Sequence, residues 1–320
     1  MSPSRPAAAL DWFLDKSLVL GWSKIGPSLR RHWWPADPPS GVLDGKHVVV
    51  TGASSGLGLA AAAALAGLGA DVHLLGRNAE RLEDAEGRIR RVHPDARLHS
   101  AVCDVSDVGS VEDFCSSLKA GIASLHALVH NAGVLPPKRT TTEQGHELTL
   151  ATHVLGPHLM TFRLAELLRG GRVVIVSSGG MYGQALPVED YEFAQGEYSG
   201  VRAYARTKRM QVVLAEQWAT ELSPHGIAVA SMHPGWSGTP GLNEALPGFV
   251  TVMGPILRTT ESSADTIVWL GATPQEWPSG LFWQDRRPRP THYGPLNKES
   301  EDDRRRFWEF VRSATGVPER

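Results

Sequence analysis

A tyrosine and a lysine four residues apart are the side chains in this 320-residue chain whose types and spacing first suggest chemistry. Tyr204 and Lys208 lie one turn apart on the same face of a helix predicted over residues 202–222. A nearby positive charge favours a phenolate, so we expect Lys208 and a bound nicotinium ring together to lower the pKa of Tyr204 toward neutrality, as general acid/base catalysis requires. Ser178, at the end of a predicted strand, has a hydroxyl that can polarise a substrate oxygen. Such a pair also occurs by chance, so its meaning depends on the elements that position it.

Those elements alternate between strand and helix from about residue 46 onward. Strands are predicted at 47–50, 71–75, 98–102, 125–130, 173–177 and 227–232, and helices at 57–68, 78–92, 108–120 and 202–222. The alternation predicts an α/β fold, a single Rossmann-type doubly wound parallel sheet of about seven strands with helices on both faces. Ligands of such sheets bind beyond the carboxyl ends of the strands, so the long connections 179–200 and 235–260 are expected to wall a substrate site.

A glycine-rich turn follows the first predicted strand and opens the first helix. Its residues are Thr51, Gly52, Ala53, Ser54, Ser55, Gly56, Leu57 and Gly58. Glycines let the backbone turn tightly and approach a pyrophosphate, and the helix N-terminus supplies N–H donors and a favourable dipole. Alone, the turn is a weak signal that a plain loop would also give. Its place between a strand and a helix favours a dinucleotide site.

The residue at the end of the second predicted strand would contact the ribose of such a dinucleotide. An acidic residue there would bond the 2′-hydroxyl, whereas an arginine accommodates a 2′-phosphate. The chain has Gly76 and Arg77 at this point and no carboxylate. We therefore expect NADP(H) to be favoured over NAD(H). The alternative is a solvated arginine without a ligand.

Together these residues resemble the short-chain dehydrogenase/reductase family over about residues 43–285. The motifs that carry the resemblance, in family order, are Thr51–Gly58, Asp104, Asn131-Ala132-Gly133, Ser177-Ser178, Tyr204 with Lys208, and Pro234-Gly235 with Thr239. Segments around Ser178, Lys208, Pro234 and Asp285 look like the branch called dehydrogenase/reductase family member 12. The spacing between Ser178 and Tyr204 is more distantly similar to that of the retinol-dehydrogenase group.

The resemblance implies a role for each matching residue. The cofactor-binding set would be Gly52, Ser54, Ser55, Gly56, Leu57, Gly58, Arg77, Asp104, Val105, Asn131, Ala132, Gly133, Tyr204, Lys208, Pro234, Gly235 and Thr239. Asp104 would touch the adenine, and Thr239 would hold the nicotinamide carboxamide. Ser178 would position the carbonyl, Tyr204 would transfer the proton, and Lys208 would bind the ribose and tune Tyr204.

His153 departs from the family pattern. The family usually has a catalytic asparagine here, which ties a water to the backbone and completes a proton relay from the lysine. Histidine can donate and accept hydrogen bonds, so His153 is a candidate catalytic residue in place of asparagine. The alternative is a half-buried histidine with a structural role. His130, where a second asparagine is frequent, is expected to be structural.

The two long connections are apolar. They carry Met181, Tyr182, Trp236, Leu242, Leu246, Phe249, Val252 and Met253, and they contain no lysine or arginine at 179–199 or 236–256. A pocket lined this way suits a lipophilic carbonyl or alcohol. The alternative is that these side chains pack the loops onto the core.

Residues 1–40 form an extension before the main domain of residues 41–285, and a tail of residues 286–320 follows it. An apolar stripe in the extension comprises Leu10, Phe13, Leu14, Leu18, Gly21, Trp22 and Ile25. Residues 8–34 are therefore a candidate amphipathic helix for peripheral membrane contact. The alternative is an arm that packs on the protein or on the mate in a homo-oligomer. In the tail, Phe307, Phe310 and Val311 predict a short capping helix.

The composition of the chain limits the partners, the compartment and the functions that the sequence allows. A net charge of −2 gives no reason to expect a nucleic-acid partner. The two cysteines suit a reducing, cytoplasmic compartment and lack metal-ligand spacing, so no metal is expected. The N-terminus resembles neither a signal peptide nor a membrane span. Two functions remain: an active oxidoreductase, and a catalytically impaired dinucleotide-binding module that acts through protein contacts.

Overall fold

The structure is a computed structural model that describes residues 5–238, 248, 251, 253–294 and 297–318. Its strands are β1 His47–Thr51, β2 Asp71–Gly76, β3 Arg97–Val102, β4 Ala127–His130, β5 Arg172–Val176, β6 Ala228–Met232, β7 Leu281–Gln284 and β8 Arg287–Arg289. Its α-helices are α1 Arg5–Lys16, α2 Leu18–Trp22, α3 Ile25–Arg30, α4 Gly56–Gly67, α5 Ala79–Val92, α6 Val108–Gly121, α7 Leu148–Leu150, α8 Gly156–Arg163, α9 Gly200–Glu221, α12 Thr260–Ala272 and α13 Glu301–Thr315. A π-helical turn, η2, covers Ala151–Leu155, and 3₁₀ turns occur at η1 Arg31–Trp33, η3 Gly179–Gly183, η4 Ser223–His225 and η5 Gly254–Ile256.

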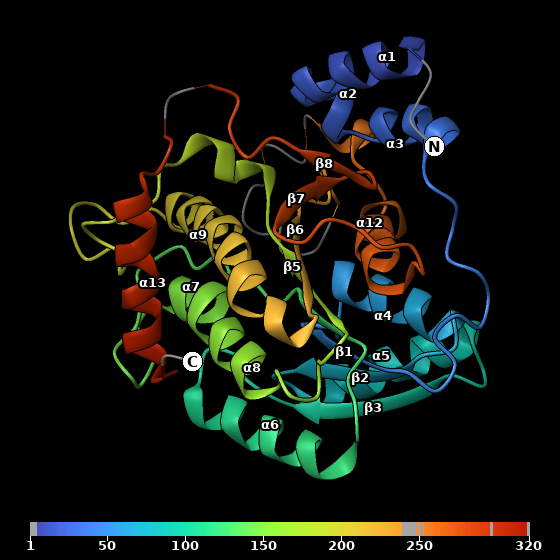
Figure 1. The fold of residues 1–320 in the computed structure, drawn as a ribbon, viewed down its shortest axis with the longest axis horizontal. Helices are drawn as coiled ribbons and strands as arrows, with labels where there is room; N and C mark the ends of the chain where they lie inside the picture. Colours follow the sequence, from blue (N-terminus) through green and yellow to red (C-terminus); the bar gives the residue numbers. More distant parts are fainter. Residues whose placement is uncertain (1–4, 239–247, 249–250, 252, 295–296, 319–320) are drawn as a thin grey trace.

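All eight strands form one sheet in the order β3-β2-β1-β4-β5-β6-β7-β8 (Figure 1). Strands β1 to β7 are parallel, so the predicted α/β doubly wound architecture is confirmed. The last strand, β8, pairs antiparallel with β7 and was not expected. The chain order reverses between β1 and β4, which is where sheets of this kind bind their ligands.

Apolar, β-branched runs explain the central strands. In β5, Val173 and Ile175 pack into the core on one face, and Val174 and Val176 pack into the core on the other. A strand buried on both faces needs a continuous apolar run, which is how these segments read. Helices α4, α5 and α12 cover one face, and α6, α8 and α9 cover the other (Figure 1).

The N-terminal segment forms three short helices instead of one continuous helix. The chain breaks at Ser17, whose hydroxyl caps α2 by accepting from the Leu20 amide at 3.3 Å. The segment then lies beside β8 (Figure 1). The predicted apolar stripe is consequently divided: Leu14 and Trp22 are buried, whereas Phe13 is 53% exposed.

Buried ion pairs hold this N-terminal arm, residues 5–34, against the sheet. The guanidinium of Arg30 donates to Asp285 at 2.6 Å and to Asp11 at 2.9 Å. Arg258 pairs with the other oxygen of Asp285 at 2.6 Å, and Arg289 pairs with Asp11 at 2.9 Å. The arm thus packs on the protein itself. Across the described residues, no helix combines the length and the apolar character that a membrane span requires.

At the other end of the chain, α13 packs against α8 and α9 (Figure 1). It begins with a capping box between Ser300 and Asp303, which satisfies amides at its first turn. Phe307 and Val311 are buried in the core, and Phe310 stacks on Tyr191 with ring centres 4.4 Å apart. The predicted helix at the tail is present.

Candidate active site

Nearly all the predicted site residues lie at the carboxyl ends of the parallel strands. The glycine turn follows β1, Arg77 follows β2, Asp104 and Val105 follow β3, Asn131 to Gly133 follow β4, Ser178 follows β5, and Pro234 and Gly235 follow β6. Tyr204 and Lys208 lie on α9, and His153 lies on η2. Thr239 lies outside the described residues. The topology therefore gathers residues from six strands along one edge of the sheet.

The glycine turn is locked to the loop after β4. Gly52 has a φ of +66°, and a Cβ there would lie 2.9 Å from the Cα of Ala132. A Cβ on Gly58 would lie 2.2 Å from the carbonyl oxygen of Gly52. Asn131 donates its side-chain amide to the Thr51 carbonyl at 3.0 Å, and Thr51 accepts from the amides of Asn131 and Ala132 at 3.0 Å. Both glycines are therefore required by packing, and Asn131 braces the turn.

The start of α4 fits a pyrophosphate. Ser55 occupies the N-cap position, yet its side chain makes no capping hydrogen bond. The first turn of α4 contains no acidic residue. The positive end of the helix dipole, with the amides of Gly56, Leu57 and Gly58, is thus left for an external anion.

Arg77 is exposed immediately after β2, where a 2′-phosphate would be read. Its guanidinium lies 3.9 Å from the carboxylate of Asp104. Ser106 donates its amide and its hydroxyl to Asp104, at 2.9 and 2.7 Å, so this carboxylate is held in place. Arg77 and Asp104 therefore lie together beyond the carboxyl ends of β2 and β3.

Ser178 and Tyr204 meet through their hydroxyl groups. Burial raises the pKa of Tyr204, and a hydrogen bond with the Ser178 side chain opposes that rise. The ammonium of Lys208 lies 5.2 Å from the centre of the Tyr204 ring.

The side chain of Lys208 is buried next to the Tyr204 ring. Its ammonium donates to the carbonyl of Val176 at 2.7 Å and to the side-chain oxygen of Gln211 at 3.0 Å. Burial lowers the pKa of Lys208 to about 7. Gln211 in turn donates its side-chain amide to the backbone carbonyl of His153 at 2.9 Å. Gln211 therefore links Lys208 to η2, and sequence reasoning assigned it no role.

His153 has structural partners at both ring nitrogens. Nε2 accepts from the Val134 amide at 3.0 Å, so Nδ1 carries the proton and donates to Thr207 at 2.8 Å. Burial, followed by the positive charge of Lys208, holds the pKa of His153 well below its usual value, so the ring is neutral. Its edge faces Tyr204 with ring centres 5.4 Å apart. His153 fixes the loop after β4 to α9 and supports the Tyr204 ring.

The N-terminal arm reaches the backbone next to Ser178, which the sequence did not predict. A Cβ on Gly179, next to Ser178, would lie 2.4 Å from the Trp22 ring. Trp22 also contacts His233 and Trp236, with ring centres 4.8 and 6.0 Å apart. The arm therefore supplies an aromatic wall beside Ser178.

Two predicted wall residues instead pack into the protein. Met181 is fully buried against Val212 and Phe282, and the Tyr182 hydroxyl donates to the Pro290 carbonyl at 2.7 Å. Among the other predicted wall residues, Leu242, Leu246, Phe249 and Val252 lie outside the described residues.

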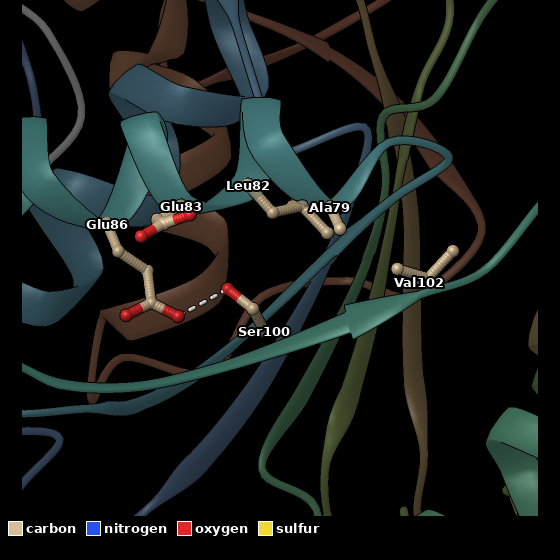
Figure 2. Close-up of a pocket in the computed structure, with 6 residues that line it drawn as sticks. All are labelled: Ala79, Leu82, Glu83, Glu86, Ser100 and Val102. Atoms are coloured by element: carbon tan, nitrogen blue, oxygen red, sulfur yellow. Dashed lines mark hydrogen bonds between the residues drawn. The ribbon is translucent and has the colours of Figure 1, made fainter.

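A separate hollow lies between α5 and β3 (Figure 2). It is lined by Ala79, Leu82, Glu83, Glu86, Ser100 and Val102. Glu86 and Ser100 share a hydrogen bond across its floor. Helix α5 covers the face opposite to α9, so this hollow belongs to the other side of the sheet from Tyr204.

Comparison with known proteins agrees with this geometry. Residues 46–247 match the family model described as short chain dehydrogenase. The human dehydrogenase/reductase SDR family member 12 is 39% identical over 78% of this chain and 80% of its own length. Mouse retinol dehydrogenase 14 is 31% identical over 99% of both chains.

Solved structures of the same architecture include two bacterial proteins. A short-chain dehydrogenase from Shigella flexneri, complexed with NADP, superposes with a TM-score of 0.63 at 22% identity and covers 78% of this chain and 100% of that one. A short-chain type dehydrogenase/reductase from Mycobacterium marinum gives a TM-score of 0.63 at 23% identity, covering 75% and 93%. On the sequence match, the chain belongs to the short-chain dehydrogenase/reductase family and is an NAD(P)-dependent oxidoreductase acting on a small molecule.

Proposed function

We propose that this protein interconverts a lipophilic carbonyl and the corresponding alcohol, with NADP(H) favoured over NAD(H). The observation that carries the proposal is the convergence of Ser178, Tyr204 and Lys208 at one point of the sheet edge. A nicotinamide dinucleotide bound along this edge would supply or accept the hydride. The glycine turn, with the free start of α4, would hold its pyrophosphate.

The proton follows a short route through this chain's own residues. In the reductive direction, Ser178 donates a hydrogen bond to the carbonyl oxygen, which polarises the carbon for hydride addition. Tyr204 then gives its proton to the same oxygen, and the product is the alcohol. Positive charge on Lys208 stabilises the phenolate that remains, and the surrounding burial strengthens that interaction. In the oxidative direction, each step reverses.

We propose that His153 positions this machinery without transferring a proton. Its two nitrogens already bond Val134 and Thr207, and its neutral ring supports Tyr204. In the same proposal, the side chain of Gln211 replaces the water that the family asparagine would hold. That side chain reaches both the Lys208 ammonium and the His153 carbonyl.

The preference for NADP(H) rests on Arg77, and the preference for a lipophilic body rests on the aromatic wall of Trp22 and Trp236. Retinol dehydrogenases among the relatives act, by name, on a lipophilic alcohol, which supports the same class of substrate.

The experiment is a turnover screen with NADPH and NADH against long-chain aldehydes, terpenoid ketones, steroid ketones and quinones. We expect NADPH-dependent reduction of at least one lipophilic carbonyl, with little turnover of short polar carbonyls. Tight NADPH binding without turnover on any of them would contradict the proposal and favour a binding module that acts through protein contacts.

A further inference from the structure

Three histidines lie together on neighbouring strands, away from Tyr204. His47 is the first residue of β1, and His73 and His99 lie in the middle of β2 and β3. The register pairs His73 with His99, and it pairs His47 with Asp71, two residues before His73. Side chains at these positions share one face of the parallel sheet. The three strands are neighbours at one end of the sheet order, with β3 as the edge strand (Figure 1).

The ring nitrogens are close enough to share one ion. One nitrogen of each histidine lies within 4.8 Å of the other two, and Nδ1 of His47 lies 3.1 Å from Nε2 of His73. Two imidazoles bound to one tetrahedral Zn²⁺ at about 2.0–2.1 Å place their nitrogens about 3.3 Å apart. The nitrogens of His47 and His73 already lie near that spacing, and rotation of the rings would have to shorten the remaining separations, which are at most 4.8 Å.

The surroundings suit a cation. Asp71, on the same face, places a carboxylate oxygen 3.6 Å from Nε2 of His99, and a carboxylate in that position orients a metal-binding imidazole. The same carboxylate accepts from Arg97 at 2.8 Å, so this guanidinium is already paired. His73 is buried, while the His99 side chain is half exposed. An ion would thus have an entry route and an open coordination position facing water.

We infer that His47, His73 and His99 form a binding site for one zinc-class divalent ion, with three imidazole ligands and solvent in the remaining position. His47 opens the strand whose far end carries the glycine turn, so the site lies apart from the reacting groups. A bound ion would join β1, β2 and β3, and it would stabilise the fold by an amount that grows with the ratio of free ion concentration to Kd.

The test uses full-length protein without a histidine tag. Cobalt(II) is titrated as a visible-absorbing probe, Zn²⁺ is added in competition, and thermal unfolding is followed with and without Zn²⁺. We expect one ion per chain and a melting temperature that rises with Zn²⁺. His99→Ala changes an exposed side chain on an edge strand, so the fold should tolerate it, and His32→Ala removes an exposed histidine of the arm as the matched control.

Loss of an outer partner alone weakens metal sites by about 10–100-fold. We therefore expect His99→Ala to weaken binding by at least about tenfold and to abolish the Zn²⁺-dependent rise in melting temperature, while His32→Ala behaves as the native protein. The inference is overturned if the native protein binds no ion, or if His99→Ala and His32→Ala bind with the same affinity and stoichiometry. Neither result bears on hydride transfer at Tyr204, so the two proposals fail separately.

Discussion

The ammonium of Lys208 donates a hydrogen bond to the side-chain oxygen of Gln211, one helical turn further along α9. The side-chain amide of Gln211 in turn donates to the backbone carbonyl of His153, so the buried Gln211 side chain connects Lys208 to η2. Buried polar networks hold their members in fixed positions only when every member is satisfied. We therefore infer that Gln211 is a positioning residue for Lys208.

Replacing Gln211 with Ala should lower kcat, by up to about 10²-fold, because misplacement of a catalytic group costs about that much. KM for the carbonyl substrate should change little. The ionisation of Lys208 should shift to lower pH in the activity profile, because its charged form loses an acceptor. Gln217→Ala is the matched control, since Gln217 lies on the same helix and donates to Arg304 instead. An unchanged pH profile in Gln211→Ala would remove this role.

Replacing Arg77 with Ala should weaken NADPH binding far more than NADH binding. The lost interaction with a 2′-phosphate is one or two charge-assisted hydrogen bonds, about 1.5–3 kcal/mol each. Direct titration of both cofactors, followed by fluorescence, measures the difference. Arg81→Ala, an exposed arginine on α5, serves as the control. Equal affinity of the native protein for both cofactors would sink the NADP(H) preference.

Lys208 should make the stability of the cofactor-free protein depend on pH. Its pKa is about 7 in the folded chain and near 10.5 when unfolded, because burial disfavours the ammonium. Below pH 7, Lys208 is protonated in both the folded and the unfolded chain, and the buried positive charge destabilises the folded chain to its full extent. Between these values the unfolded state binds more protons, so the free energy of unfolding rises with pH.

Lys208→Met removes this dependence. The difference in unfolding free energy, variant minus native, should therefore be largest below pH 7 and fall as pH approaches 10, as measured by urea denaturation at several pH values. A difference in unfolding free energy that stays constant across this pH range would show that the pKa of Lys208 is not lowered in the folded chain.

Membrane contact through the N-terminal arm is a separate prediction. Trp12 is 64% exposed and Phe13 is 53% exposed, although the arm is anchored through Arg30. We expect sedimentation with vesicles of phosphatidylcholine and phosphatidylserine, and its loss in the double variant Trp12→Ser and Phe13→Ser. A double variant of two exposed valines, Val92→Ser and Val102→Ser, is the control. Recovery of the native protein in the supernatant would reject membrane contact.

Local patterns were sufficient to predict most of the sheet. Runs such as Val173–Val176 are apolar and β-branched, and every predicted strand appears within two residues of its expected ends. The strand β8 was missed because Arg287–Arg289 carries no apolar pattern and forms only by pairing with β7. The arm was misread as one helix because its fold depends on Arg30 meeting Asp285, 255 residues away.

In the site, too, local sequence identified some residues, whereas the roles of others depend on contacts between residues far apart in the chain. The family pattern marked His153 as unusual, but its role depends on Thr207, 54 residues later, and on Val134. The contact of Gln211 with Lys208 could have been predicted from the sequence, since Gln211 lies three residues after Lys208 on the same helical face. The cluster of His47, His73 and His99 has no local spacing, because strand register alone brings it together.

The rate of single-turnover hydride transfer shows whether Tyr204 donates the proton. Enzyme saturated with NADPH is mixed with an accepted carbonyl substrate, and the loss of nicotinamide absorbance is followed for the native protein, Tyr204→Phe and the control Tyr198→Phe. Tyr198 bonds Glu147 outside the site. We predict that Tyr204→Phe slows the step about 10²–10⁴-fold, the usual contribution of a general acid, while Tyr198→Phe leaves it unchanged. A rate for Tyr204→Phe within a few-fold of the native rate would contradict the mechanism.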